Sequence, residues 1–427
     1  MCCGKVTVIF PLFAASAQGL NKNPTRLNEM VMRNRGKTYS QQLDLLRGMA
    51  IVLMIVNHSG VRLLDPAEQQ QGLLGALLFL GSFAPVVFFF TTGFGIGIGR
   101  REVTLTHFGS TLLKAGLLLF ADQLMFWENA KPFGLDFLGF IALSSVVVTG
   151  VAACKRPRTL CVAFIVIAFV LRFGIGPWLR IHGELPARGA WLFGVTPVDG
   201  ISYPLSPWII YPLLGFLMAH RYSTAVDSGG SFLWPWVSVP AIGALALSVI
   251  MYAEHAIFFR WGTVSFAFFV LSISLCLVCV VAAWRLGTKG SLATRLLSLR
   301  GIASLAVVPI HFALIETLVA SGIAPLAEAT MLAAMATLVA VSLFLSRLFA
   351  RRVDRWISSS PRTVAWYPVA AVAIFSAIAI WTLPRPSFAV FAAMVVGQLA
   401  IAGLIEVRGR RIAAAGTDLL QTRPSDQ

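Results

Sequence analysis

Charged residues are scarce in this sequence: Asp, Glu, Lys and Arg make up only 12% of the 427 residues, whereas hydrophobic residues make up 57%. Soluble domains carry about 25% charged residues, so the composition excludes a soluble enzyme and indicates a membrane protein. Acidic residues are the scarcer sign, 18 against 34 Lys and Arg, which leaves a net charge of +16. In a soluble protein this surplus would suggest nucleic-acid binding, but in a membrane protein basic cytoplasmic loops account for it.

Cysteine and metal-binding patterns are also missing. The six cysteines form no disulfide framework of the small secreted kind, and the one CxxC, Cys276 and Cys279, lies inside an apolar run that is typical of a buried helix. No HExxH occurs and the six histidines are never four residues apart, so we expect no metal site.

Long apolar runs are what the sequence does contain. Each is close to the roughly 20 residues that a membrane-spanning helix needs, and their continuity argues for helices rather than a β-barrel. We therefore predict an all-α polytopic transmembrane helical bundle of about twelve spans, within a range of 10–12. The run at 203–219 carries three prolines, so we expect that span to be broken or short. The predicted spans are 43–61, 72–98, 106–126, 133–153, 159–178, 203–219, 232–253, 263–284, 301–320, 325–346, 364–382 and 386–405.

The loop charges predict the orientation of these spans. With the N-terminus inside, the inner segments hold 25 of the 34 Lys and Arg residues and the outer loops hold 6, so both termini are expected in the cytoplasm. Three parts follow: a basic cytoplasmic N-terminal segment at 1–42, a transmembrane domain at 43–405 and a polar cytoplasmic tail at 406–427. Residues 1–29 resemble a signal peptide in composition, but cleavage there would oppose the charge count. We interpret them as an extension upstream of the native start.

The first span, Leu43–Gly60, carries charged and titratable residues in an ordered spacing. Arg47 and His58 are eleven positions apart, which on an α-helix means almost the same face and a rise of about 16.5 Å. Asp44 lies one turn before Arg47 and is expected to pair with it. An imidazole as deep in the bilayer as His58 is costly unless it faces the bundle interior or water, so it is a functional-site candidate, with a packing histidine as the alternative.

Further polar residues lie within or near other spans. His311, two residues after Pro309 in the ninth span, is expected either to face a cavity with His58 or to be a buried, hydrogen-bonded histidine. Lys114 and Asp122 in the third span are about 80° away from sharing a face, so each is expected to pair with another helix. We expect three acidic residues near outer span ends to contact a substrate, although exposed acids are also common there: Asp136, Asp199 and Glu316.

The glycines of "TTGFGIGIG" invite comparison with a phosphate-binding loop. No strand precedes them and they end a hydrophobic helix, so close helix packing, or a break near the inner face, is the better interpretation.

Several segments together resemble a known family. Two segments are similar to the transmembrane acyltransferase superfamily. The first is "LDLLRG", with ten residues between its Arg47 and His58, and the second is "SFAPVVFFFTTGFGIGIGRR" at Ser82–Arg101. This superfamily includes the acyltransferase-3 proteins and the heparan-α-glucosaminide N-acetyltransferase-like branch. The acyltransferase-3 pattern of two arginines separated by two residues near the third span is not present here, where only adjacent Arg100 and Arg101 occur. Three later segments resemble the second branch: "FGLDFLGFIALS" at Phe133–Ser144, "YPLSPWIIYPLLGFLMAHR" at Tyr203–Arg221 and "LRGIASLAVVPIHFALIE" at Leu299–Glu316.

The resemblance implies an integral membrane acyltransferase that moves an acyl group, usually acetyl, from cytoplasmic acyl-CoA to a hydroxyl or amine of a glycan or other polar acceptor at the outer side. His58, with His311, would then act as general base or carry the acyl group, and the sequence leaves both open. Candidate partners for the phosphates of the donor are Arg47, Arg100 and Arg101. Three more basic residues precede the ninth span on the inner side: Lys289, Arg295 and Arg300. We expect the bacterial cytoplasmic membrane as the location and allow for a homo-oligomer.

A secondary transporter or flippase is the alternative, because isolated ionisable residues in a twelve-span bundle suit that class equally well. Transporters of this size commonly show similarity between their halves. No second copy of the "LDLLRG" to His58 pattern occurs in residues 214–427, which favours the enzyme.

Overall fold

The computed structural model describes residues 24–69, 72–99, 103–130, 134–183, 189–227, 243, 264–287, 291–359, 366–385 and 387–421. Four predictions concern residues outside these ranges: the upstream extension before residue 24, the donor contacts Arg100 and Arg101, the residue Lys289, and the span at 232–253 apart from Gly243.

Helices make up the described part of the chain, which contains no β-strand. In the first half they are α1 (Pro24–Leu63), α2 (Gly72–Gly81), α3 (Ala84–Gly99), α4 (Leu105–Glu128), α5 (Phe137–Ala152), α6 (Pro157–Val170), the π-helix η1 (Leu171–Ile175), α7 (Gly176–Ile181), α8 (Ala190–Phe193), α9 (Leu205–Trp208) and α10 (Ile210–Asp227). In the second half they are α12 (Phe266–Leu286), α13 (Leu292–Leu297), α14 (Ile302–Ala320), α15 (Glu328–Ser359), α16 (Trp366–Thr382) and α17 (Phe388–Gln421).

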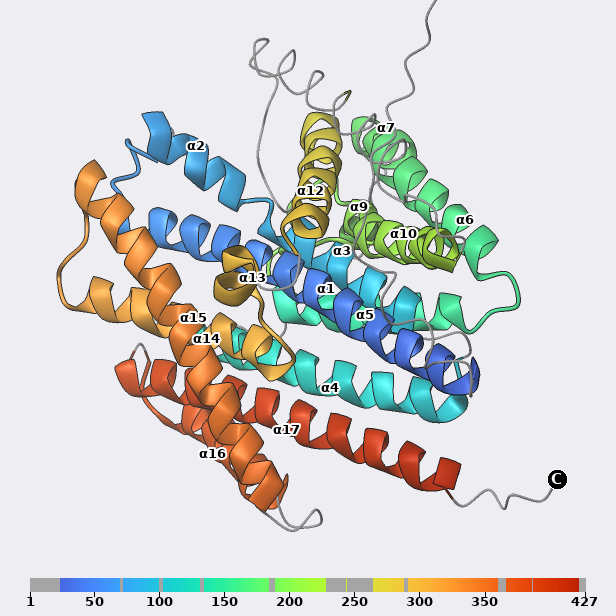
Figure 1. Cartoon of the computed structure of the whole chain (residues 1–427). Coiled ribbons are helices and arrows are strands. Elements are labelled where there is room, and N and C mark those ends of the chain that lie inside the picture. The colour runs from blue at the N-terminus through green and yellow to red at the C-terminus, as the bar shows by residue number, and fades with distance from the viewer. Residues whose placement is uncertain are drawn as a thin grey trace, which may run out of the picture.

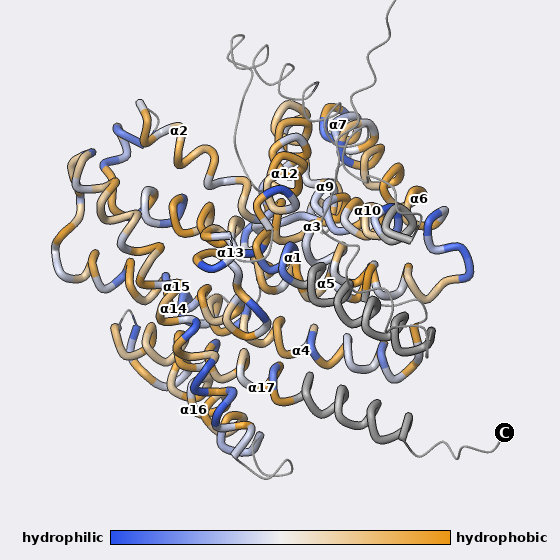
Figure 2. The backbone as a smooth tube through the Cα atoms, in the orientation of Figure 1, coloured by the Kyte–Doolittle hydropathy of each residue, from blue (hydrophilic) through white to orange (hydrophobic). Residues whose placement is uncertain are grey.

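The helices pack side by side as one bundle, with hydrophobic residues along most of their length and hydrophilic residues gathered in turns and at helix ends (Figures 1 and 2). Among the described residues, seven helical segments are long and apolar enough to cross a membrane, and α5 and α16 are shorter apolar helices. Each predicted span other than 232–253 coincides with one helix or with consecutive helices. The prediction of an all-α polytopic helical bundle is therefore confirmed, while the span count stays a prediction.

Two predicted spans are interrupted. The span at 203–219 divides into α9 and α10, and Ser206 inside α9 has extended rather than helical backbone angles, as its three prolines lead one to expect. The span at 72–98 divides into α2 and α3 at Ser82 and Phe83. In contrast, α14 continues through Pro309 without a break.

Glycines allow α3 and α10 to pack backbone against backbone. A Cβ atom on Gly93 would lie 1.7 Å from the carbonyl oxygen of Pro212, and one on Gly215 would lie 2.1 Å from that of Phe90. Gly97 is four positions after Gly93, and a Cβ atom on it would lie 2.6 Å from the Cβ of Ala219. This is the small-residue spacing of tightly packed membrane helices. It confirms close packing, and not phosphate binding, as the interpretation of the glycine run.

The two long terminal helices begin and end at the same end of the bundle (Figure 1). α1 runs without interruption from Pro24 into the first span, and α17 runs from the last span to Gln421. The predicted boundaries at 42/43 and 405/406 therefore fall inside continuous helices. The loop charges require both termini to lie on the same side of the membrane. That this side is the cytoplasm stays a prediction.

Candidate active site

His58 on α1 and His311 on α14 form a hydrogen-bonded pair. His58 Nδ1 lies 2.8 Å from His311 Nε2, and the two rings stack with centroids 5.1 Å apart. The residues are 253 positions apart in sequence, so only the packing of α1 on α14 joins them. His311 is fully buried, whereas His58 is partly exposed to a cavity. The sequence predicted both residues for the site, and the structure places them in contact.

The hydrogen bonds of the pair determine which nitrogen of each neutral ring carries the proton. His311 Nδ1 lies 2.8 Å from the carbonyl oxygen of Val307, and a carbonyl only accepts, so His311 Nδ1 is protonated and its Nε2 carries a lone pair. That lone pair accepts the hydrogen bond from His58 Nδ1. His58 Nε2 is then left unprotonated, which is the state that a general base or a nucleophile needs.

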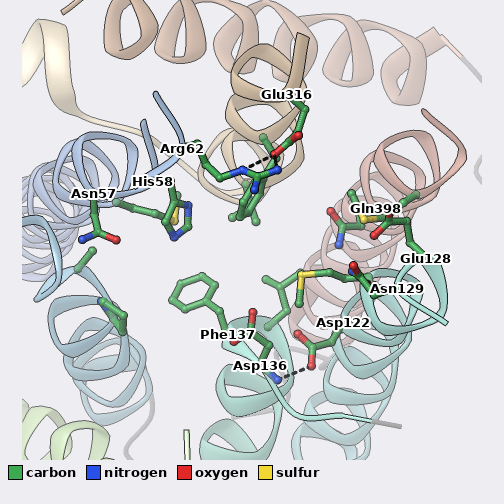
Figure 3. A pocket seen from close by; sticks show the side chains of 18 of the residues that line it. Asn57, His58, Arg62, Asp122, Glu128, Asn129, Asp136, Phe137, Glu316 and Gln398 are labelled. Carbon is green, nitrogen blue, oxygen red and sulfur yellow. Dashed lines mark hydrogen bonds and ion pairs between the residues drawn. The ribbon is translucent and has the colours of Figure 1, made fainter. Parts of the chain in front are cut away.

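A cavity of about 390 Å³ opens in front of His58, a size typical of small-molecule sites. Polar side chains from five helices or their ends surround it, and Figure 3 shows them converging on a common space. The polar and titratable lining residues are Asn57, His58, Arg62, Asp122, Glu128, Asn129, Asp136, Tyr203, Glu316 and Gln398. His311 is not among the lining residues and lies behind His58.

The structure places two of the three predicted acceptor contacts at this cavity. Asp136, at the start of α5, and Glu316, on α14, both line it. Asp199 is exposed in the loop before α9 and does not line it.

An ion pair lies one helical turn beyond the histidines on the same two helices. Arg62 donates from both Nε, at 2.7 Å, and Nη2 to Glu316 Oε1, and Figure 3 shows the pair above His58. Arg62 is four residues after His58 and Glu316 is five after His311. Half of the Arg62 side chain is exposed, so this pair lies at the mouth of the cavity.

Asp122 and Asp136 bring two carboxylates to the opposite wall. The Asp122 carboxylate accepts from the backbone N–H of Asp136 at 2.8 Å, and it also accepts from the N–H groups of Leu138 and Gly139. It therefore caps the N-terminus of α5 from the neighbouring helix α4, satisfying donors that lack an intrahelical partner. The Asp136 side chain bonds Ser202. As expected, Asp122 pairs outside its own helix.

Asn57 presents an unfilled acceptor beside His58. Its Nδ2 donates to the carbonyl oxygen of Leu78 at 3.0 Å, while its buried Oδ1 has no hydrogen-bond partner. A buried polar atom without a partner costs free energy, and Asn57 lines the cavity next to His58.

Seven polar cavity residues were not assigned to the site from the sequence: Asn57, Arg62, Asp122, Glu128, Asn129, Tyr203 and Gln398. The sequence does contain a signal for these residues: each is a polar residue inside or at the edge of an apolar run, and such a residue is costly unless it faces protein or water. What the sequence did not supply was the rotation of each helix toward a common centre.

The start of the first span, near the middle of α1, carries a second group of charges. Asp44 is buried and accepts from Arg47 Nη1 at 3.1 Å, as predicted, and from Arg300 Nε at 3.1 Å. Two guanidinium groups thus share one carboxylate, and the Glu406 carboxylate lies close by, 3.2 Å from the Cβ position of Gly301. Arg47 Nη2 also faces Gly95 on α3, where an added Cβ would lie 3.6 Å away.

Among the residues that the structure describes, no group of three or more His, Cys, Asp or Glu side chains is arranged to hold a metal ion.

Comparison with known proteins identifies the family. Residues 40–249, nearly half of the chain and including His58 and Asp136, match the model of the family described as Heparan-alpha-glucosaminide N-acetyltransferase, catalytic. Comparisons with curated proteins and with solved structures found no match. The match agrees with the resemblance seen in the sequence and indicates a membrane enzyme of the acetyltransferase type. The match over residues 40–249 supports the heparan-alpha-glucosaminide N-acetyltransferase-like family of transmembrane acyltransferases for this chain.

Proposed function

We propose that this protein transfers an acyl group, with acetyl as the expected one, from cytoplasmic acyl-CoA to a hydroxyl or amine of a glycan or other polar acceptor at the outer side of the membrane. The observation that carries the proposal is the hydrogen bond between His58 Nδ1 and His311 Nε2, because it leaves His58 Nε2 unprotonated at a cavity. The family match supports the reaction class.

Two routes start from the same atom. In the first, His58 Nε2 takes the proton of the acceptor O–H or N–H while the acceptor attacks the thioester carbon; the C–S bond breaks and the coenzyme A thiolate takes that proton. In the second, His58 Nε2 attacks the thioester carbon and the C–S bond breaks, so coenzyme A leaves as its thiolate. The acceptor then attacks the acyl carbon, the bond from that carbon to His58 Nε2 breaks, and the thiolate takes the proton of the acceptor. Either way His58 becomes positively charged for part of the cycle, and its Nδ1–H bond to His311 is then charge-assisted and stronger.

The donor is proposed to reach His58 from the start of the first span, near the middle of α1. Arg47 and Arg300 bond Asp44 there, and their remaining guanidinium donors are proposed to bind the phosphates of coenzyme A. Along the helix axis Arg47 and His58 are about 16.5 Å apart, a distance that the flexible arm of coenzyme A spans. Arg100 and Arg101 remain proposed donor contacts.

The acceptor is proposed to enter past the Arg62–Glu316 pair. The carboxylates of Asp136 and Glu316 line the cavity and suit hydroxyl or amine groups, which donate hydrogen bonds. Asp199 is proposed only as an outer contact of a larger acceptor. We propose the bacterial cytoplasmic membrane as the location, and a homo-oligomer remains an expectation.

The test is acetyl transfer by the purified protein in detergent. Acetyl-CoA with a radiolabelled acetyl group is supplied with glucosamine, which offers an amine and hydroxyls, or with glucose, which offers hydroxyls alone. The proposal expects label on an acceptor, or slow release of labelled acetate without one. Neither transfer nor hydrolysis, together with uptake of a polar solute by proteoliposomes, would support the transporter alternative instead.

A further inference from the structure

Two arginines lie close together where α6 passes through the π-helix η1 into α7. Arg172 is in η1 and is 9% exposed, and Arg180 is in the last turn of α7 and exposed. By the predicted topology this is the outer end of the bundle. Single π-helical turns interrupt an α-helix at an energetic cost and often occur at functional sites.

Backbone carbonyls hold both guanidinium groups in place. Arg172 Nη2 donates to the carbonyl oxygen of Val264, just before α12, and Arg180 Nη1 donates to that of Val195 at 3.2 Å. Arg172 also lies over the ring of Phe173, 5.2 Å from its centroid. These contacts fix the directions of the side chains without neutralising their charge.

The charge on these two arginines is not paired with a carboxylate within the part of the chain that the structure describes. The two guanidinium groups lie close enough to repel each other. Arg172 Nε is buried without a hydrogen-bond partner. Charged side chains at membrane depth normally pair with an opposite charge or line a functional site, because an uncompensated buried charge is costly.

A hollow of about 530 Å³ lies in front of the pair. Its lining residues are Arg172, Pro177, Arg180, Ile181, Val195, Pro197 and Ser265. Ser265 is the N-cap of the 21-residue helix α12, so the positive end of that helix dipole borders the same space. The hollow shares no lining residue with the His58 cavity.

We propose that Arg172 and Arg180 form a binding site for an oxyanion, such as a phosphate group. Planar guanidinium groups with free donors match oxyanion geometry, and an oxyanion would supply both the missing charge and a partner for Arg172 Nε. The oxyanion comes either from a lipid headgroup or from a soluble ion. Ile175, Trp178 and Ile181 are exposed apolar side chains beside the hollow, as a lipid-facing surface requires. This site does not depend on the proposed acyl transfer.

The test measures thermal unfolding of the full chain in phosphate-free detergent while a probe is titrated. The probes are inorganic phosphate, short-chain phosphatidylglycerol and short-chain phosphatidylcholine. The proteins are the wild type, Arg180→Gln, Arg172→Gln and Arg172→Lys, with Arg156→Gln as a charge-matched control, because Arg156 is exposed and lines neither cavity. Arg180 is exposed, so Arg180→Gln is expected to fold even if Arg172→Gln does not.

We expect phosphate or phosphatidylglycerol to raise the unfolding midpoint of the wild type and of Arg156→Gln. Loss of one charge-assisted hydrogen bond should move the half-saturating concentration at least roughly tenfold higher in Arg180→Gln. A response to phosphate alone identifies a soluble oxyanion, and a response to phosphatidylglycerol without phosphate identifies a lipid headgroup. Equal responses of the wild type and Arg180→Gln, or no response of the wild type to any probe, would overturn the proposal.

Discussion

At the scale of single residues, the site depends on the division of roles between the two histidines. His58 faces the cavity and has its reactive nitrogen free, whereas His311 is buried behind it, with its ring against His58, Phe312 and the carbonyl of Val307. His311 is therefore a positioning residue. Without its Nε2 as acceptor, His58 loses the partner that keeps the proton on Nδ1, and its tautomer is no longer fixed.

Substitution of His311 tests this role. His311→Ala should lower kcat for acyl transfer roughly 100-fold, near the lower limit for loss of acid–base catalysis, with little change in the KM for acyl-CoA. His311→Gln should recover part of the rate, because its amide oxygen can accept from His58 Nδ1–H. Steady-state kinetics of both variants would reveal this ranking. If Gln and Ala impair kcat equally while lowering stability equally, His311 serves only to pack the core.

Arg47 is a residue for which binding and structural roles compete. It pairs with Asp44 in the structure, so its charge has a local use, but Arg300 bonds the same carboxylate. If Arg47 holds the donor phosphates, Arg47→Lys should weaken acyl-CoA binding roughly 10- to 150-fold, since it loses a charge-assisted hydrogen bond of about 1.5–3 kcal/mol. Calorimetric titration of acyl-CoA measures this change directly. An unchanged affinity with a lower unfolding temperature would mean that Arg47 only steadies the start of the first span.

The residue scale also shows how far the sequence could lead. The spacing of Arg47 and His58 follows from the period of one helix, and the structure places both residues on the continuous helix α1. The contact between His58 and His311 depends on the register between two helices 253 residues apart, which no local pattern encodes. Asp122 and Gln398 are recognisable in the sequence as polar residues in apolar runs. That they line the same cavity was not predictable, because this too depends on how separate helices pack.

At the scale of elements, the close approach of α3 and α10 holds the first half of the bundle together. The glycine spacing predicted tight packing, and the structure identifies the partner as α10, with Gly215 opposite Phe90. The break between α9 and α10 was likewise readable from the prolines. The division of 72–98 into α2 and α3 was not expected, because "LGSFAP" is short and lies within a continuous apolar run.

Substitution of Gly93 tests the α3–α10 contact. A Cβ at Gly93 would lie 1.7 Å from a backbone carbonyl that cannot move without shifting α10, so Gly93→Ala should destabilise the protein by about 1–3 kcal/mol, as overpacking does. Gly116→Ala in α4 is the matched control, because nothing lies within 4 Å of its Cβ position, and alanine should raise stability by up to about 1 kcal/mol. Thermal unfolding in detergent compares the two. Equal effects would show that the helices are not in backbone contact.

At the scale of the whole molecule, the account requires two chemically different ends of one bundle. The histidine cavity opens at the Arg62–Glu316 end of α1 and α14, whereas Arg47, Asp44 and Arg300 lie at the opposite end. The loop charges predict that the second end is cytoplasmic. Donor and acceptor would then approach His58 from different sides of the membrane.

Labelling with a membrane-impermeant thiol reagent tests this orientation. Native Cys154 is exposed in the turn between α5 and α6 and is predicted to face the cytoplasm. In a chain that retains only this cysteine, reagent added outside intact cells should not react. Glu68→Cys, exposed in the turn between α1 and α2, should react when it is the sole cysteine. The reverse pattern would invert the bundle and contradict the proposed direction of transfer.

The central claim is that His58 performs the chemistry, and the most direct measurement is the turnover of acetyl transfer by His58→Ala. His107→Ala is the control, because His107 lies in the first turn of α4 and does not line the cavity. The account predicts that His58→Ala folds, since little packing volume is lost, still binds acetyl-CoA, and transfers acetyl at least 100-fold more slowly, while His107→Ala retains the wild-type rate. Near-wild-type turnover by His58→Ala would contradict the account.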